Sequence, residues 1–382
     1  MKMLFVTHAG DPGGAEFTLL AVCRSMREDA EVLLLQHGSF EKVLREQNIR
    51  YSVHEMGSVA HGVRRGGDLR SVVRAIPATV SAVAHLARTA RRFDVVVCFS
   101  QKAFVIAALA KPFMRRPIVW FMNDILSTDH FSPLMIRMVT GLARIAADQV
   151  ALVSQQAMDA WVRAGGRRRG ANVVISGIDT DDIARQLEDR ARVVSYRARF
   201  TPDGRPLIGM FGRICRWKGQ DVFLRAMAQV PGARAIVVGG TFFEEREFAQ
   251  ELSRLVTELA LSDRVEFVGH VEDPITLMAA CDVVAHCSTA PEPSGRVITE
   301  AMFAGTPVIG SNAGGVPEFI VQNETGQLTP LNDHEALAAA IRRYLDNPQW
   351  SREVAAKARH SAEEKFSARA TISGFQRAIE SL

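Results

Sequence analysis

The chain has 382 residues, of which 47% are hydrophobic and 23% charged, a composition that excludes a disordered or low-complexity protein. This length is too great for one ordinary hydrophobic core and predicts two domains of roughly 150–200 residues each. The 5 cysteines form no C-x-x-C pair, so the sequence favours reduced thiols in a cytoplasmic protein over a disulfide framework or a zinc site. No stretch is long and apolar enough to predict a membrane span.

The formal net charge of +4 is distributed unevenly. Residues 1–178 contain 23 Lys and Arg against 14 Asp and Glu, whereas the remainder contains 23 basic and 28 acidic residues, so the two parts carry +9 and −5. A basic half predicts an anionic partner, but no aromatic-rich basic strand of the kind that stacks nucleic-acid bases is present. We expect an anionic membrane surface or an anionic acceptor, and no nucleic acid; a basic face that is merely solvated is the alternative.

Short, β-branched apolar runs alternate along the chain with stretches of helical periodicity. In the first half, strands are predicted at residues 2–8, 31–36, 94–100, 117–123 and 149–154. In the second half, they are predicted at residues 206–212, 233–240, 264–270, 282–288 and 306–312. Strands that are buried on both faces and separated by helices form parallel sheets, so the predicted class is α/β.

A charged, strandless stretch at residues 181–205 interrupts this alternation and is predicted to be a linker. It would separate an N-terminal Rossmann-like domain (residues 1–180) from a C-terminal one (residues 206–365). Residues 366–382 are predicted to form a C-terminal helix that packs back on the first domain. Two doubly wound domains in tandem would face each other across a cleft at the carboxyl ends of their strands.

Glycines follow the first predicted strand in "THAGDPGGAEF", at Gly10, Gly13 and Gly14, just before a helix that Glu16 helps to open. Backbone N–H groups without side chains at a helix N-terminus can cradle a phosphate. The motif is not G-x-G-x-x-G and no acidic residue closes the second strand, which disfavours a dinucleotide site. A tight strand-to-helix turn is the equally weighted alternative.

Two cations follow the first strand of the second half in "GRICRWKG", at Arg213 and Lys218. Both lie where a doubly wound sheet binds ligands, so they could reach one phosphate as a fork and a point charge. No Walker sequence is present. Two exposed cations near a turn are the alternative.

Two carboxylates flank a predicted helix start in "EPSGRVITEAMFAG". Glu292 lies in the loop, and Glu300 lies one and a half turns inside the helix, so roughly 7–8 Å of helix plus the loop separates them. This exceeds the separation of about 5–5.5 Å in a retaining glycosidase. The helix start near Gly295 favours a negative charge, and carboxylates accept hydrogen bonds from hydroxyls. A nucleotide diphosphate sugar has this layout; two unrelated surface glutamates are the alternative.

These segments, with "NETGQLTP" after them, resemble the donor-site signature of the retaining glycosyltransferases of family 4, which have the GT-B fold and an E-x7-E pair, here Glu292 and Glu300. The resemblance covers the whole chain. It implies that Glu300 binds the ribose, Glu292 the donor sugar, and Arg213 with Lys218 the diphosphate. The first domain would then bind the acceptor and the second the nucleotide sugar.

The resemblance also implies sets of site residues, without a metal site. The donor-binding set is Gly13, Gly14, Gly212, Arg213, Lys218, Glu292, Ser294, Gly295, Arg296, Val297 and Glu300. The catalytic set is Glu292, Arg213, Lys218, Asn123 and Asp124, and the acceptor-binding set is Glu16 and His130.

The sequence departs from the family pattern at three places. Ser294 replaces a usual aromatic residue, which would alter the sugar-side pocket, and Ser176 replaces the Asn of a usual Asn-Gly. Asn123 and Asp124 stand where many members have a His near the donor sugar, whose role Asn123, Asp124 or His130 could take.

The sequence therefore predicts a retaining, metal-independent hexosyltransferase that needs no cofactor beyond its donor substrate. It would move a hexose from a UDP- or GDP-linked donor, by front-face attack, to a hydroxyl of a glycan or lipid-linked acceptor in bacterial polysaccharide or glycolipid biosynthesis. The expected location is the cytoplasm, with peripheral attachment to the inner face of the cell membrane. A nucleotide-sugar epimerase of the same architecture and an inactive nucleotide-sugar-binding protein are the alternatives.

Overall fold

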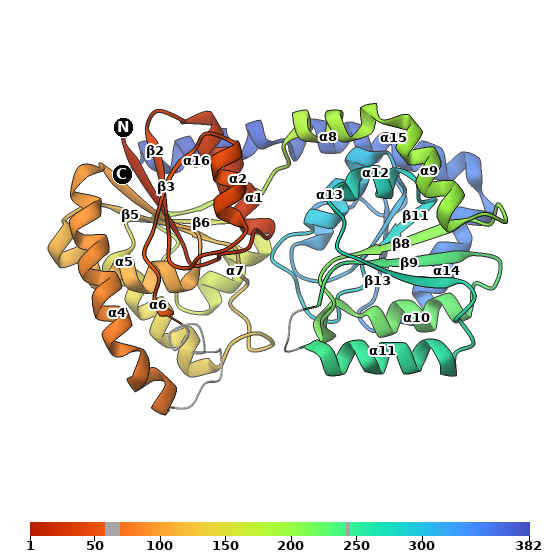
Figure 1. Cartoon of the computed structure of the whole chain (residues 1–382), viewed down its shortest axis with the longest axis horizontal. Helices are drawn as coiled ribbons and strands as arrows, with labels where there is room; N and C mark the ends of the chain where they lie inside the picture. Colours follow the sequence, from red (N-terminus) through yellow and green to blue (C-terminus); the bar gives the residue numbers. More distant parts are fainter. Residues whose placement is uncertain (58–68, 242–244) are drawn as a thin grey trace. The chain divides into compact units, whose positions relative to one another are not determined.

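The computed structural model describes residues 1–57, 69–241 and 245–382, and the chain divides into two compact units, each built on a sheet flanked by helices (Figure 1). The first unit comprises Met1–Gly177 together with Ala368–Leu382, and the second comprises Ile178–Ser367. The segment predicted as a C-terminal helix contains α16 (Ala368–Glu380), which belongs to the first unit.

The first unit contains a parallel sheet in the order β3-β2-β1-β4-β5-β6-β7. Its strands are β1 (Met3–Thr7), β2 (Ala30–Leu34), β3 (Arg50–Val53), β4 (Val95–Cys98), β5 (Ile118–Met122), β6 (Gln149–Leu152) and β7 (Ala171–Val173). The strand order reverses between β1 and β4, and such a switch point is where doubly wound sheets bind ligands.

Successive side chains of each strand point to opposite faces of the sheet, and helices cover both faces. Leu4 and Val6 of β1 pack in one core with four helices: α4 (Leu69–Thr89), α5 (Gln101–Met114), α6 (Pro133–Ala146) and α7 (Gln155–Arg163). Met3 and Phe5 pack in the opposite core with α1 (Gly14–Ser25), α2 (Phe40–Glu46) and α16. The 3-10 helix η1 (Ala90–Arg92) follows α4.

The second unit contains a parallel sheet in the order β10-β9-β8-β11-β12-β13, with its switch point between β8 and β11. Its strands are β8 (Leu207–Phe211), β9 (Arg234–Val238), β10 (Val265–Gly269), β11 (Val283–Ala285), β12 (Val308–Ser311) and β13 (Gln327–Thr329). Its α-helices are α8 (Thr180–Glu188), α9 (Arg190–Phe200), α10 (Gln220–Ala228), α11 (Arg246–Glu258), α12 (Pro274–Ala279), α13 (Arg296–Ala304), α14 (His334–Asp346) and α15 (Pro348–Lys365). The 3-10 helices η2 (Arg216–Lys218) and η4 (Val316–Glu318) follow β8 and β12.

Residues 181–205, predicted to be a linker, instead contribute most of α8 and all of α9 to the second unit. This stretch is charged and strandless, but several of its charges form ion pairs with other parts of the second unit. Arg192 and Arg197 of α9 each lie 2.6 Å from an aspartate of that unit, Asp273 and Asp282 respectively. The linker expectation was therefore wrong, because the charges belong to half-exposed helices with ionic partners.

Among the helices of the described residues, none combines the length and the low polarity that a membrane crossing requires.

Candidate functional site

The predicted cations and carboxylates of the second unit meet at the switch point of its sheet. Lys218 ends η2, which follows β8, and Glu292 lies in the loop between β11 and α13. Because β8 and β11 are parallel neighbours, their carboxyl ends open at the same edge of the sheet. Two side chains that are 74 positions apart in the sequence therefore come into contact.

The contact is a largely buried ion pair. The Lys218 Nζ lies 2.5 Å from Oε1 of Glu292, and the two side chains are 15% and 7% exposed. The ammonium also lies 4.5 Å from the centre of the Trp217 ring, within the range of a cation–π interaction. A buried pair is stable only where further hydrogen bonds satisfy its charges, and Glu292 has two more.

Three donors converge on Oε1 of Glu292. Besides the Lys218 ammonium, these are the Ser288 hydroxyl and Nε2 of His286, which lies 3.0 Å away. Burial alone would raise the pKa of Glu292, but Lys218 and His286 outweigh it and hold that pKa well below its ordinary range. Glu292 is therefore an ionised, firmly oriented acceptor for hydroxyl hydrogen bonds.

The second predicted carboxylate forms its own ion pair on α13. The Glu300 Oε1 lies 2.9 Å from Nε of Arg296, which is one helical turn earlier, and both side chains are mostly buried. Burial raises the pKa of Glu300, and Arg296 offsets part of that effect. The structure thus places Glu300 inside the helix as predicted, while its role at a ribose stays a prediction.

The paired glycines after β12 hold the loop that carries Glu292. A Cβ atom at Gly314, where φ is +61°, would lie 2.2 Å from the Glu292 carbonyl oxygen. The N–H of Gly315 donates to that same oxygen at 2.7 Å. Because only glycine allows this backbone approach and this φ, the turn sets the position of Glu292.

Another glycine, Gly219, allows the start of α10 to pack against the loop that follows β11. Its φ is +74°, and a Cβ there would lie 2.0 Å from the carbonyl oxygen of Cys287. This close approach places Lys218, the preceding residue, beside the loop after β11. The Lys218 side chain also passes Gly212, where a Cβ would lie 3.8 Å from its Cδ and Cε.

The other predicted donor-binding residues of this unit surround the same loop and helix start. Arg213 follows β8 after Gly212 and is exposed, and its carbonyl oxygen accepts a hydrogen bond from Nε2 of Gln220 at 3.0 Å. Gly295 is buried at the N-cap of α13, while Ser294 and Val297 on either side of it are half-buried. The two cations predicted as a pair therefore differ in burial, because Lys218 is largely buried against Glu292 and Arg213 is exposed.

In the first unit, Glu16 closes the glycine loop after β1. Its Oε2 accepts from the Gly13 N–H at 3.1 Å, and its Oε1 accepts from the Thr7 hydroxyl at 3.0 Å. Burial raises the pKa of Glu16, and these hydrogen bonds partly oppose that effect. Glu16 therefore holds the loop in which Gly14 begins α1, while its contact with an acceptor and the phosphate contact of Gly13 and Gly14 stay predictions.

Asn123 joins the ends of two strands at the same sheet edge. Its Nδ2 donates to the carbonyl oxygens of Phe99 and Phe121, at 3.2 and 3.3 Å. Asp124 and His130 follow on the same segment and are half-buried. The amide thus has a structural use, and the catalytic roles of Asn123 and Asp124 stay predictions, as does the acceptor contact of His130.

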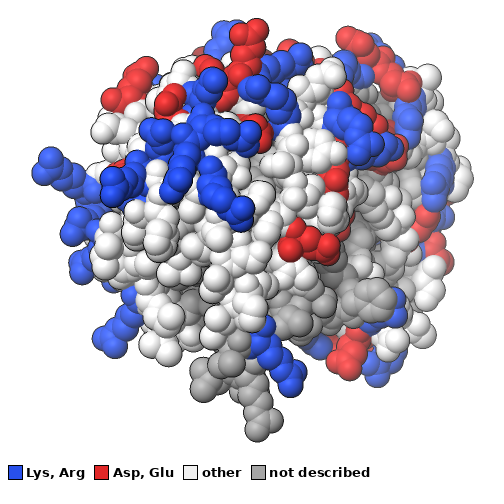
Figure 2. Space-filling view, turned by 60° about the vertical axis from the view of Figure 1, so that its left-hand side comes forward, with Lys and Arg blue, Asp and Glu red and all other residues white. Residues whose placement is uncertain are grey.

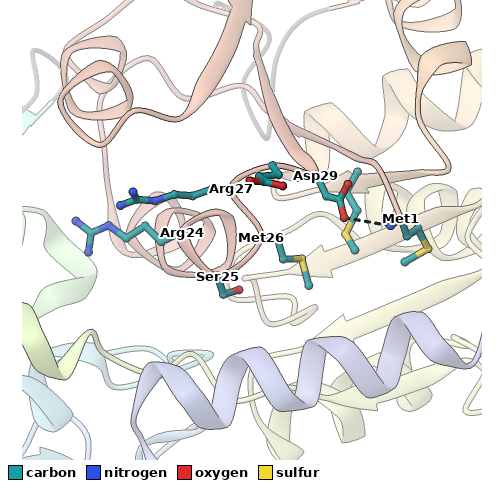
Figure 3. Close-up of a pocket in the computed structure, with 8 residues that line it drawn as sticks. Met1, Arg24, Ser25, Met26, Arg27 and Asp29 are labelled. Carbon is teal, nitrogen blue, oxygen red and sulfur yellow. Dashed lines mark hydrogen bonds and ion pairs between the residues drawn. The ribbon is translucent and has the colours of Figure 1, made fainter.

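A separate surface concavity of the first unit lies where α1 ends and β2 begins (Figure 3). Arg24 and Arg27 extend to one side of it, and the Met1 amino group lies 3.1 Å from a carboxylate oxygen of Asp29. None of the predicted site residues lines it.

Two residues of the Glu292 cluster were missed from the sequence. His286 and Ser288 are buried, and they follow β11 with a spacing of two in "VVAHCS". Residues two apart in extended chain point to the same side, so a polar pair just past an apolar strand was the available signal.

Models of two glycosyltransferase families match the chain, one over each unit. The model described as "Glycosyl transferases group 1" matches residues 195–364, and the model described as "Glycosyltransferase Family 4" matches residues 12–182.

The chain matches curated relatives over only part of their length. The chain is 34% identical to the D-inositol 3-phosphate glycosyltransferase of Mycolicibacterium smegmatis over 51% of this chain and 43% of the relative. It is 37% identical to the lipopolysaccharide core biosynthesis mannosyltransferase LpcC of Rhizobium leguminosarum bv. viciae over 38% of this chain and 42% of the relative. The matches thus span less than half the length of these two relatives.

A solved structure matches over its whole length. Anabaena HepE in complex with UDP-glucose is 34% identical, covers 100% of both chains and superimposes with a TM-score of 0.89. Two Rossmann-like units, two family models that together span both of them, and this full-length relative lead to one assignment. The chain belongs to the glycosyltransferases of the GT-B fold.

Proposed function

We propose that this protein is a retaining, metal-independent hexosyltransferase that moves a hexose from a UDP- or GDP-linked donor to a hydroxyl of a glycan or lipid-linked acceptor. The observation that carries this proposal is the cluster at the switch point between β8 and β11, where Lys218 meets Glu292 beside the start of α13. The UDP-glucose complex of HepE and the mannosyltransferase name of LpcC support a nucleotide-linked hexose.

The cluster suits both parts of such a donor. Negative charge grows on the diphosphate as it leaves, and Lys218, Arg213 and the N-terminus of α13 supply positive potential without a cofactor. Glu292 and Glu300 can accept hydrogen bonds from sugar and ribose hydroxyls. Metal independence, in this proposal, follows from these fixed positive charges.

Front-face substitution is the mechanism that this site supports best. The acceptor oxygen bonds to the anomeric carbon on the face from which the diphosphate oxygen departs, and that oxygen takes the acceptor proton, so the configuration is retained. A covalent intermediate on Glu292 is less favourable, because three donors already occupy its Oε1. Hydrogen-bonded in this way, Oε1 is a weak nucleophile.

We also propose that the acceptor is met at an anionic membrane surface. Helices α4 and α5 pack together, as do α5 and α6, on one face of the first sheet. Their three sequences contain no Asp or Glu, and Arg74, Arg88, Arg137 and Arg144 are exposed on them. Figure 2, in which the left-hand side of Figure 1 comes forward, shows Lys and Arg grouped beside a wide uncharged surface.

Apolar side chains are exposed on the same helices. Among the described residues, 7 of the 13 exposed large hydrophobic side chains lie there: Ile76, Val80, Leu109, Phe113, Leu134, Met138 and Ile145. Exposed apolar groups with cations and no anions are typical of reversible, peripheral membrane contact. Arg91 and Arg92 of η1 add charge nearby, while Arg64 and Arg65 of the predicted basic surface lie outside the described residues.

A calorimetric screen of UDP- and GDP-hexoses, followed by incubation with each donor alone, tests the proposed function. We expect one class of donor to bind and to stay unisomerised without an acceptor. Conversion of the donor to its epimer would favour the epimerase instead. Binding without turnover under any acceptor condition would favour the inactive binding protein, and absence of binding to every donor would contradict all three.

A further inference from the structure

His286 is a buried imidazole in direct contact with the predicted sugar-binding carboxylate. Its side chain is 3% exposed, and its Nε2 lies 3.0 Å from Oε1 of Glu292 and 3.2 Å from Oγ of Ser288. Its Nδ1 is buried and has no hydrogen-bond partner among the described residues. The neutral tautomer with a proton on Nε2 therefore donates toward Glu292 and leaves Nδ1 able to bind a second proton.

The charges around His286 balance as the structure stands. Lys218 of η2 and Glu292 form a pair, and Arg296 and Glu300 of α13 form another. Other charged side chains of the surrounding elements include Arg213 after β8, Arg216 of η2, and Asp221 and Arg225 of α10. Arg216 pairs with Glu251, and Arg225 pairs with Asp221. The neighbouring thiol of Cys287 stays neutral because burial raises its pKa. The Ser311 hydroxyl of β12 donates to the His286 carbonyl oxygen at 3.2 Å.

A bound donor would change this balance. A nucleotide sugar carries two negative charges on its diphosphate, and the proposed function places them on Lys218. The one ammonium that compensates the buried Glu292 would then be shared with phosphate, and a buried carboxylate without a full partner is strongly unfavourable. His286 is the titratable side chain, besides Lys218, that contacts this carboxylate, and imidazole binds protons near neutral pH.

We infer that His286 is a positioning residue that takes up a proton from solvent when the donor diphosphate engages Lys218, so that Glu292 stays ionised and oriented toward the sugar. This inference rests on the proposed function, because the donor is what triggers proton uptake. Donor binding is thus coupled to the binding of a proton, and donor affinity falls as the pH is raised. Full coupling to one proton corresponds to about a tenfold loss of affinity per pH unit.

Two substitutions separate orientation from proton uptake. His286→Gln keeps an N–H donor near Glu292 but cannot bind a proton, whereas His286→Leu removes both properties at similar volume. His360→Gln is a matched control, because His360 also contacts a glutamate, Glu364 at 3.5 Å, but on the exposed surface of α15.

The experiment is titration calorimetry of the full chain with UDP-glucose and GDP-mannose, in buffers of different ionisation enthalpy near pH 7.5. The slope of the measured heat against the ionisation enthalpy of the buffer gives the number of protons taken up on binding. The difference in this number between wild type and a variant excludes any protons released by the ligand, because that contribution is the same for both proteins. We expect wild type and His360→Gln to take up at least half a proton more than His286→Gln. His286→Gln should bind within about threefold of wild type at this pH but lose the pH dependence, and His286→Leu should bind at least tenfold more weakly.

Equal proton uptake by wild type and His286→Gln, with intact binding, would overturn the role of His286 while leaving the proposed function standing. Absence of heat with both donors in folded wild-type protein would instead contradict the donor assignment, and this inference with it. Because His286→Gln is conservative, it stays informative if His286→Leu fails to fold, which a thermal melt of each variant shows.

Discussion

Lys218 and Glu292, carried by different loops of the second unit, form a 2.5 Å ion pair at the switch point of its sheet. One residue is predicted to bind the diphosphate and the other the donor sugar. Their contact means that the two halves of the predicted donor site are electrostatically connected before any ligand arrives. A change on either side should therefore be measurable on the other.

Lys218→Ala should weaken binding of UDP or GDP by roughly tenfold to a hundredfold, because a charge-assisted hydrogen bond contributes about 1.5–3 kcal/mol. Binding of the free nucleoside should change little. Arg216→Ala is the matched control, because Arg216 lies in the same 3-10 helix and pairs on the surface with Glu251. Calorimetry with nucleoside and with nucleoside diphosphate measures the two affinities. An equal loss of affinity for both ligands would mean that Lys218 does not bind the phosphates.

Glu300→Ala should weaken binding of the nucleoside itself by roughly tenfold, because it removes the acceptor for ribose hydroxyls and leaves Arg296 without its partner. Glu363→Ala removes the same kind of helical pair, with Arg359 at 2.9 Å, from the surface of α15 and serves as the control. If Glu300→Ala binds the nucleoside as tightly as wild type, Glu300 has only a structural role.

Gly314→Ala should reduce both stability and donor affinity, because its Cβ would strike the backbone of Glu292. Gly305→Ala provides the comparison, since Gly305 has a similar φ of +74° but nothing within 4 Å of its Cβ position. Backbone strain alone costs about 1–2 kcal/mol in each variant. Donor titrations on both proteins should show a loss only in Gly314→Ala; an equal effect on affinity would mean that the turn does not position Glu292.

Apolar substitutions on α6 and charge reversal on η1 should each abolish binding to vesicles that contain anionic lipid. Each cation near such a surface contributes on the order of 1 kcal/mol, and the attraction decays over a Debye length of about 8 Å at physiological salt. A combined Leu134→Asp and Met138→Asp variant should remain in solution in a vesicle co-sedimentation assay, as should charge reversal at Arg91 and Arg92.

Val194→Asp, at an exposed apolar position on α9, should behave like wild type in that assay. Donor affinity should be the same in all these variants. If wild-type protein does not sediment with anionic vesicles at low salt, the basic face is merely solvated and the acceptor is better sought among soluble molecules.

The central strands of each sheet could be predicted from the sequence, whereas three of the four edge strands could not. All ten predicted strands are present, because a strand covered on both faces leaves a nearly continuous apolar run such as Met3–Thr7. The strands β3, β7 and β13 were missed. They have three or four residues each, and the edge strands β3 and β7 are only partly buried, so their sequences carry little hydrophobic signal.

In the site, the relative positions of residues within one segment could be predicted from the sequence, but contacts between residues of different segments could not. The positions of Glu292 and Glu300 around the start of α13 follow from residues adjacent in the chain. The contact between Lys218 and Glu292 depends on β8 and β11 being neighbours, which no local pattern encodes. His286 was missed for the same reason, since its partner is defined by how the loop after β11 folds back against Gly314.

The most direct test of transfer with retention is proton NMR of the reaction product. The full chain would be incubated, with a chelator present, with the donor selected by the calorimetric screen and with octyl α-mannoside or octyl β-glucoside as the acceptor probe. We expect release of the nucleoside diphosphate and a new glycosidic bond with the same anomeric configuration as the donor, both lost in Lys218→Ala. A product of inverted configuration, or turnover that requires added metal ion, would contradict this mechanism.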